Sequence, residues 1–108
     1  MKPAKHQVSN LYVEQVREMV LAKLAGLQVK VYLFGSRATG KACETADIDV
    51  AIEPFEALPI GLLSDIREQL EESNIPFPVD LVDLSSASEK LAAMVRQEGI
   101  LWKDCKPD

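Results

Sequence analysis

The sequence predicts a two-layer α+β fold in which helices pack on a small mixed sheet. Three segments repeat apolar residues at helical spacing, and the segments between them are rich in β-branched and aromatic residues or alternate apolar with polar ones. Gly and Pro residues separate these segments, and 108 residues is the length of one domain. We therefore expect a single domain over residues 1–108, with residues 1–8 as a flexible leader in which His6 has no role.

The first half of the chain is predicted to form one helix and one strand before a turn. Residues 9–26 place apolar side chains on one helical face, with Ser9 or Asn10 able to cap the start and Gly26 able to end the helix. Residues 27–34, LQVKVYLF, are expected to form a buried strand. This strand leads directly into a Gly-Ser turn.

A second strand is predicted after the turn, at residues 47–53. Its sequence, DIDVAIE, alternates between apolar and polar positions. Asp47 and Asp49 therefore project from the same face, with Cα atoms roughly 6.5 Å apart. Asp is depleted in strands and its charge is costly to bury, so either this face is solvated, as on an edge strand, or a cation binds there.

The second half of the chain is predicted to continue with helix, strand, helix and a short final strand. Pro59 suits the first turn of a helix over residues 60–73, and the strand that opens after Pro78 is apolar on both faces, as in a central strand. Ser86 and Glu89 have capping-box spacing for the last helix. The remaining predicted boundaries are residues 85–99 for that helix, Gly99 for its end and residues 100–103 for the final strand.

Composition excludes several kinds of partner. With 17 acidic and 12 basic residues the net charge is -5, so an extended nucleic-acid surface, which needs a basic footprint, is not expected. No apolar run approaches the length of a membrane span. Cys43 and Cys105 are too few for a disulfide framework and are expected to be reduced thiols, which indicates a cytoplasmic protein. A local site for a phosphorylated ligand with a divalent metal remains compatible with the charge.

A third acid, Asp80, makes the pair of Asp47 and Asp49 more informative. If the strand that carries Asp80 lies beside theirs, three carboxylates converge and repel one another unless a metal or protons neutralise them. Carboxylates at this spacing suit two divalent cations roughly 3.5–4 Å apart, and Mg²⁺ combines few carboxylates with water and phosphate. Asp80 could instead pair with Arg37 or Lys41.

The turn at Gly35 and Ser36 supplies a complementary feature. Gly35 lets the backbone approach a ligand closely, and Ser36 could begin a short helix whose N–H groups and hydroxyl bind phosphate. Arg37 and Lys41 add positive charge nearby. A Gly-Ser pair alone is often only a turn, but its occurrence with the acids predicts phosphate donors and metal ligands at one end of the sheet.

These motifs together resemble a known family. The stretch GSRATGKACETADIDVAI, with Gly-Ser followed after ten residues by Asp-x-Asp, and the later VDLVDL are similar to the minimal nucleotidyltransferases of the DNA polymerase beta superfamily. The resemblance extends from Val29 to Trp102. It implies the palm fold of that superfamily and Mg²⁺-dependent transfer of a nucleoside monophosphate, AMP from ATP, to an acceptor hydroxyl with release of pyrophosphate. It also implies that Asp47, Asp49 and Asp80 bind two Mg²⁺ ions and are catalytic, and that Asp80 favours deprotonation of the acceptor.

By the same resemblance, Gly35, Ser36 and Arg37 bind the nucleotide and Asp83 is structural. Thr39 departs from the pattern, because relatives often have Arg at this position, and one phosphate or acceptor contact is therefore expected to be absent.

Many proteins similar to this one are the antitoxin half of a two-protein module whose toxin is a HEPN-domain RNase. The resemblance therefore implies a HEPN toxin as partner, silenced by AMP on a tyrosine hydroxyl. Two alternatives stay open: an antitoxin that neutralises its partner by binding alone, and transfer to a small molecule or RNA. The three intact acids favour catalysis, and neither a second acceptor-binding domain nor a basic stripe is expected. Assembly with itself or with the toxin is left open.

Overall fold

The structure, a computed structural model, describes residues 5–40 and 47–104. Lys41, Cys43 and Cys105 lie outside these residues. Within the described part, no helix is long and apolar enough to cross a membrane. The elements in chain order are α1 (Lys5–Lys23), β1 (Val29–Phe34), α2 (Ser36–Thr39), β2 (Ile48–Pro54), α3 (Leu62–Glu72), β3 (Val79–Asp83), α4 (Glu89–Glu98) and β4 (Ile100–Asp104).

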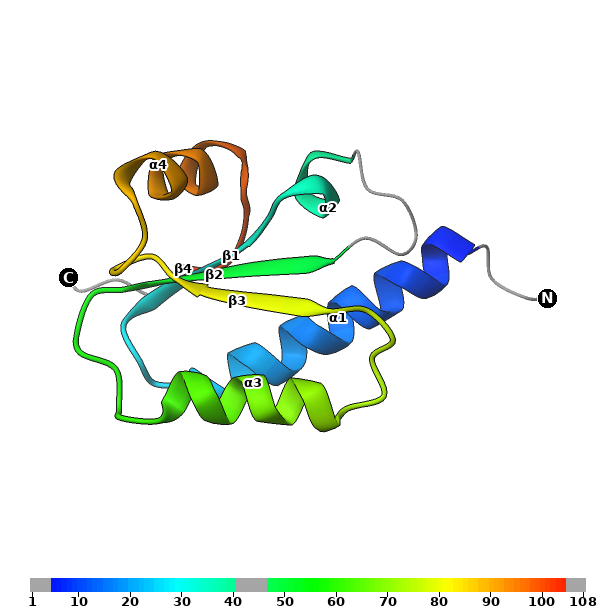
Figure 1. Cartoon of the computed structure of the whole chain (residues 1–108), viewed down its shortest axis with the longest axis horizontal. Helices are drawn as coiled ribbons and strands as arrows, with labels where there is room; N and C mark the ends of the chain where they lie inside the picture. The colour runs from blue at the N-terminus through cyan, green and yellow to red at the C-terminus, as the bar shows by residue number, and fades with distance from the viewer. Residues whose placement is uncertain (1–4, 41–46, 105–108) are drawn as a thin grey trace.

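The strands form one mixed sheet with the order β3-β2-β1-β4. β1 runs antiparallel to β2 and β4, whereas β2 and β3 are parallel. Figure 1 shows α1 and α3 on one face of the sheet and α2 and α4 on the other. The predicted α+β class and the mixed sheet packed by helices are confirmed. Helices cover both faces of this sheet, however, and not one face as in a two-layer fold.

Helices can cover both faces because the central strands are apolar on both. Ile48, Val50 and Ile52 of β2 are fully buried in the larger core cluster, together with residues of α1 and α3. On the opposite face Ala51 is also fully buried, in a smaller cluster formed with Tyr32, Phe34, Leu84, Ala92 and Val95. Asp49 lies on the same side of β2 as Ala51, near the start of the strand, and its register partner in β1 is Phe34 of this cluster.

The start of the first helix differs from the prediction. α1 begins at Lys5, so residues 5–8 belong to the helix rather than to a leader, and Ser9 and Asn10 lie inside it instead of capping it. Its end is close to the expected one, since the helix stops at Lys23 and Gly26 has a φ of 81°.

The two later helices, by contrast, begin after their predicted positions. α3 follows Gly61, and Pro59 contributes a carbonyl that accepts from Leu62 N at 3.2 Å, outside the helix. α4 is capped by Ser88, whose Oγ accepts from Leu91 N at 3.1 Å. The capping box with Ser86 is wrong, because the Ser86 hydroxyl donates to the Asp83 carbonyl and closes the turn after β3.

β3 is an edge strand and not the central strand that its two apolar faces predicted. Both faces are nevertheless covered, since Leu81 packs in the larger cluster and Leu84, just beyond the strand, in the smaller one. Arg67 of α3 donates from Nη2 to the Leu81 carbonyl at 2.9 Å. This bond occupies one of the backbone acceptors that an edge strand leaves unpaired.

The core assignment predicts a large difference between two isoleucines. Ile52 is fully buried, whereas Ile60 is 105% exposed. We expect Ile52→Ala to lower the free energy of unfolding by about 2–5 kcal/mol, because it removes buried methyl groups and leaves a cavity. Ile60→Ala, the matched control, should change it by less than about 0.5 kcal/mol. Urea unfolding of both variants measures this, and equal effects would contradict the described core.

Candidate functional site

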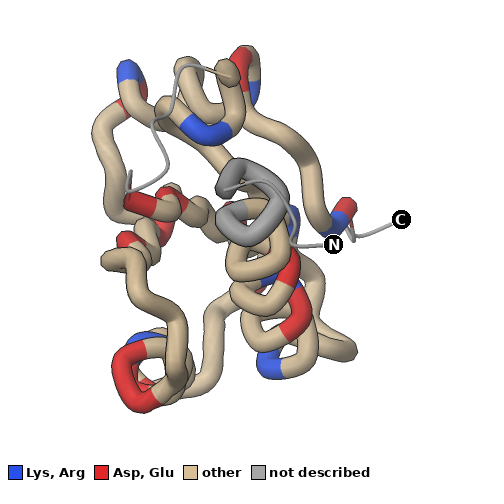
Figure 2. Tube along the Cα trace, turned by 90° about the vertical axis from the view of Figure 1, so that its right-hand side faces the viewer, with Lys and Arg blue, Asp and Glu red and all other residues tan. Residues whose placement is uncertain are grey.

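The three predicted acids meet at the end of the sheet where β1 ends and β2 and β3 begin, on the right in Figure 1. The parallel register pairs Asp49 directly with Asp80, and the antiparallel register pairs Asp49 with Phe34. Asp47 immediately precedes β2. Figure 2, which faces this end, shows acidic positions on adjacent strands. Because β2 is central, Asp49 does not lie on the solvated face of an edge strand.

Electrostatics shows that these carboxylates act on one another. Asp49 is half-buried, while Asp47 and Asp80 are exposed. Burial raises the pKa of Asp49, and the charges of Asp80 and Asp47 raise it further, with Arg37 acting in the opposite direction. The ionised form of Asp49 is thus disfavoured in the protein alone. A cation placed here would relieve this penalty.

The carboxylates suit Mg²⁺ when a ligand supplies further oxygen atoms. Among residues 5–40 and 47–104, no three Asp, Glu, His or Cys side chains are grouped closely enough to hold a metal by themselves. Mg²⁺ does not require such a cage, because it keeps waters and takes one or two carboxylates together with substrate phosphates. The in-register pair Asp49 and Asp80, with Asp47 beside it, supplies oxygen ligands of this kind. The donor set therefore fits Mg²⁺ bound together with a phosphorylated ligand.

Gly35 is required at this site for two reasons. Its φ is 75°, a left-handed value that side chains disfavour. A Cβ at this position would also collide with Oδ2 of Asp49 and lie 3.3 Å from its Cγ. The absence of a side chain at Gly35 was expected to let a ligand approach the backbone. In the structure, the Asp49 carboxylate occupies the space that a side chain would take. Sequence reasoning missed this contact, because only the pairing of β1 with β2 brings the two residues together.

Ser36 begins the short helix α2, as predicted. The Gly35 carbonyl accepts from Ala38 N at 3.1 Å and from Thr39 N at 3.2 Å. The Thr39 hydroxyl donates to the Gly35 and Ser36 carbonyls at 3.4 and 3.3 Å. Thr39 thus supports the helix internally, in place of the ligand contact that an Arg would offer.

An aromatic pair beside α2 was not identified from the sequence. The Arg37 guanidinium carbon lies 4.8 Å from the centroid of the Phe77 ring. Tyr12 of α1 packs edge-on against Phe77, with ring centroids 5.8 Å apart. Phe77 and Asp80 also line a cleft of about 240 Å³ against Arg67 and other residues of α3. No local signal predicts this arrangement, since 40 residues separate Arg37 from Phe77.

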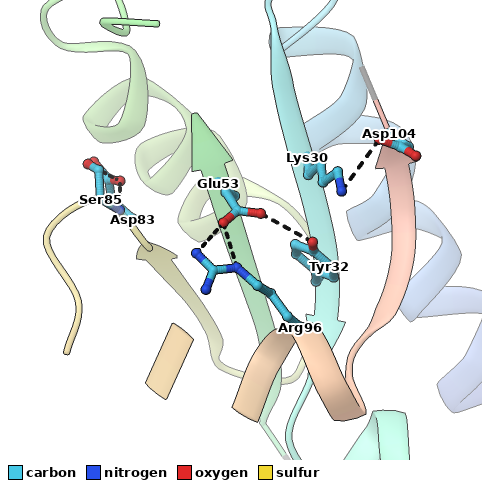
Figure 3. A network of polar contacts seen from close by, with 7 residues as sticks. All are labelled: Lys30, Tyr32, Glu53, Asp83, Ser85, Arg96 and Asp104. Atoms are coloured by element: carbon cyan, nitrogen blue, oxygen red, sulfur yellow. Dashed lines mark hydrogen bonds and ion pairs between the residues drawn. The ribbon is translucent and has the colours of Figure 1, made fainter. Parts of the chain in front are cut away.

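A second polar group lies at the opposite end of the sheet and is structural (Figure 3). Arg96 of α4 donates from Nε to Glu53 Oε2 at 2.7 Å, and the Tyr32 hydroxyl donates to Glu53 Oε1 at 3.3 Å. Asp83 accepts from the Ser85 backbone N–H at 2.9 Å and from its hydroxyl at 2.6 Å. These contacts fasten α4 and the end of β3 and support the structural role expected for Asp83.

Comparison with known proteins agrees with this geometry. Residues 24–106 match the family described as "Polymerase beta, Nucleotidyltransferase". Over 67 residues the chain is 37% identical to a probable protein adenylyltransferase, MntA, of Haemophilus influenzae, a stretch that covers 62% of this chain and 59% of that relative. The chain thus spans less than two thirds of this relative's length.

Two solved structures of toxin–antitoxin complexes contain a similar chain. One is a tri-AMPylated HEPN toxin of Shewanella oneidensis in complex with an MNT antitoxin, with 28% identity, a TM-score of 0.63 and coverage of 89% of this chain and 72% of that chain. The other is a toxin–antitoxin with AMP-PNP, with 28% identity, a TM-score of 0.64 and coverage of 82% and 73%. The family match spans most of the chain and includes the Gly-Ser turn and all three acids, so the chain belongs to the polymerase beta nucleotidyltransferase family.

Proposed function

We propose that this protein is a Mg²⁺-dependent nucleotidyltransferase that moves AMP from ATP to a tyrosine hydroxyl of a HEPN-domain toxin and thereby acts as its antitoxin. The observation that carries the proposal is the register of β2 with β3, which sets Asp49 opposite Asp80, while the pairing of β2 with β1 brings Gly35 against Asp49. The printed description of the relative as an adenylyltransferase and the AMPylated toxin in a neighbouring structure support the acceptor class.

In this proposal Asp47, Asp49 and Asp80 hold Mg²⁺, and Gly35, Ser36 and Arg37 hold the triphosphate. Bound Mg²⁺ supplies neutralisation of the phosphate charge that builds up at the α-phosphorus. The acceptor oxygen forms a bond to the α-phosphorus as the bond to pyrophosphate breaks.

Asp80 has a second role in this proposal, because it also acts on the acceptor hydroxyl. It is exposed on the edge strand β3, directly opposite Asp49 in the register, so an acceptor hydroxyl can approach it from solvent. Its carboxylate favours loss of the proton from the acceptor hydroxyl as the new bond to phosphorus forms.

The direct test uses ATP labelled at the α-phosphate, with the protein, Mg²⁺ and a lysate of its native host. Label on a discrete protein band, resistant to RNase and absent with Asp49→Asn, supports adenylylation, and the mass of the band identifies the acceptor. Label that RNase removes would indicate an RNA nucleotidyltransferase. No label, with a partner that still co-purifies, would favour an antitoxin that acts by binding alone.

Substitution of the site acids should lower the transfer rate far more than the same substitution at Asp83, another acid of β3. We expect Asp49→Asn and Asp80→Asn to lower the transfer rate by at least about 100-fold, because each removes a negatively charged ligand of the proposed Mg²⁺. Asp83→Asn is the matched control, since Asp83 bonds only locally to Ser85 in the described structure. It should retain the rate within about 3-fold. Comparable losses in all three variants would contradict the assignment.

Gly35→Ala tests the close approach of the turn to β2. The added Cβ would meet the Asp49 carboxylate and would strain a backbone with φ of 75°. We expect transfer to fall by at least about 100-fold, because misplacing a catalytic group by about 1 Å can cost this much. Gly40→Ala provides the control: its φ is 77°, but nothing lies within 4 Å of an added Cβ. It should share the strain and retain most of the activity.

The raised pKa of Asp49 predicts how stability depends on pH. An unfolded Asp has a pKa near 3.9, and the folded value is higher, so the folded state binds the proton more tightly. The stability that this residue contributes is therefore present below about pH 3.9 and is lost as pH rises through the folded pKa. Without Mg²⁺, Asp49→Asn should melt at a higher temperature than the wild type at pH 7, and the difference should vanish near pH 3.

Addition of Mg²⁺ completes this measurement. Mg²⁺ with a non-hydrolysable ATP analogue should raise the melting temperature of the wild type at pH 7, because the ligands bind only the folded state. The rise should be much smaller for Asp49→Asn. An Asp49→Asn variant that melts below the wild type at pH 7 without Mg²⁺ would contradict the raised pKa.

A further inference from the structure

We infer that Phe77 is a positioning residue for Arg37: its ring holds the guanidinium at the nucleotide side of the site, next to Asp49. The inference rests on the proposed nucleotide-binding role of Arg37 and adds the residue that orders it. It depends on three features of the structure, namely the short surface helix α2 that carries Arg37, the rigid support of Phe77 and the shared register of Phe77 with the acids.

The first feature is that α2 is short and lies at the surface. The helix has four residues and none of them is buried. Its backbone and Thr39 hydrogen bonds are internal, to the Gly35 and Ser36 carbonyls. Its contacts with distant parts of the chain include Ala38, packed against the larger core cluster, and Arg37, stacked over Phe77. The contact with Phe77 is thus one that reaches the Arg37 guanidinium itself from a distant part of the chain.

The second feature is that Phe77 is mounted stiffly. It lies between Pro76 and Pro78, whose rings restrict the backbone, and a residue before proline is confined to extended conformations. Its side chain is partly buried against the larger core cluster, and the Tyr12 ring packs against it at an interplanar angle of 81°. An edge-to-face contact of this kind restricts ring orientation. The ring can thus act as a fixed platform.

The third feature is that the platform shares its register with the acids. The Pro78 carbonyl accepts from Ile48 N at 2.9 Å, which is the first step of the ladder that pairs Asp49 with Asp80. Phe77 is thereby placed relative to Asp49, and Arg37 stacks on it within electrostatic reach of the Asp49 carboxylate. A long flexible Arg loses side-chain freedom when it binds phosphate, and ordering it beforehand reduces that loss.

The test compares Phe77→Leu, Phe77→Trp, Arg37→Met and the double variant of Phe77→Leu with Arg37→Met. Leu keeps an apolar side chain against the core but has no π face, whereas Trp offers the strongest one. The measurements are kcat and KM for ATP with the acceptor, the dissociation constant of a non-hydrolysable ATP analogue with Mg²⁺, and the melting temperature. Phe55→Leu is the control, an aromatic residue 40% exposed beyond the other end of β2.

We expect Phe77→Leu to weaken nucleotide binding and raise KM for ATP by about 3- to 10-fold, with kcat within about 2-fold, which corresponds to the loss of one cation–π contact. Phe77→Trp should retain wild-type binding. In the Arg37→Met background, Phe77→Leu should have no further effect, because Phe77 acts through the guanidinium. Phe55→Leu should leave nucleotide binding unchanged.

Three results would overturn the inference. One is a Phe77→Leu variant with unchanged nucleotide affinity. Another is an effect of equal size in the wild-type and Arg37→Met backgrounds, which would show that Phe77 acts without Arg37. The third is a Phe77→Trp variant as weak as Phe77→Leu. Failure of the proposed function would look different, since the wild type itself would then neither bind the ATP analogue nor transfer label.

Discussion

The parallel pairing of β2 with β3 is the constraint on which the rest of the site depends. Its ladder begins with the bond from Ile48 N to the Pro78 carbonyl and is closed at the other end by the bond from Leu84 N to the Ile52 carbonyl at 2.8 Å. Side chains alternate along a strand, so a shift of one residue would turn Asp80 to the opposite face. The present register instead sets it opposite Asp49. One set of backbone bonds therefore places the acids.

The grouping of three acids lowers the stability of the fold locally, and burial of the apolar side chains around it offsets this cost. Asp49 is half-buried beside two other acids, and its ionised form is disfavoured. Its neighbours in β2, Ile48 and Val50, are fully buried on the other face. Burial of such side chains contributes about 1.5–3 kcal/mol each, which offsets a local electrostatic cost. Alternation along β2 thus lets one strand contribute to the larger core on one side and carry Asp49 on the other.

The face of the sheet on which α2 and α4 lie has different contacts at its two ends. At one end, Arg96 ties α4 to Glu53, and the buried Tyr32 hydroxyl donates to the same carboxylate (Figure 3). At the other end, the four-residue α2 has no buried residue and is supported through Arg37 and Ala38. A ligand can enter only where helices leave the sheet uncovered.

Local pattern was sufficient for much of the fold and for the identity of the candidate residues. The alternation in DIDVAIE correctly predicted that Ile48, Val50 and Ile52 share a buried face, and the spacing of the Gly-Ser turn from the acids was enough to predict a candidate phosphate and metal site. Helix starts were less accurate, because Ser86 and Ser88 are both suitable caps and only the turn after β3 selects Ser88.

What only the tertiary structure decided is which distant residues meet. The apolar faces of β3 could not distinguish an edge strand covered by α3 and α4 from a central one, because burial by helices and burial between strands select the same residues. The contact of Gly35 with Asp49 and the stacking of Arg37 on Phe77 depend on strand pairing across long intervals of sequence. The sequence by itself determined the chemical groups of the site, since these follow from residue type and local spacing. Their mutual positions were decided by the sheet register, a property of the folded chain as a whole.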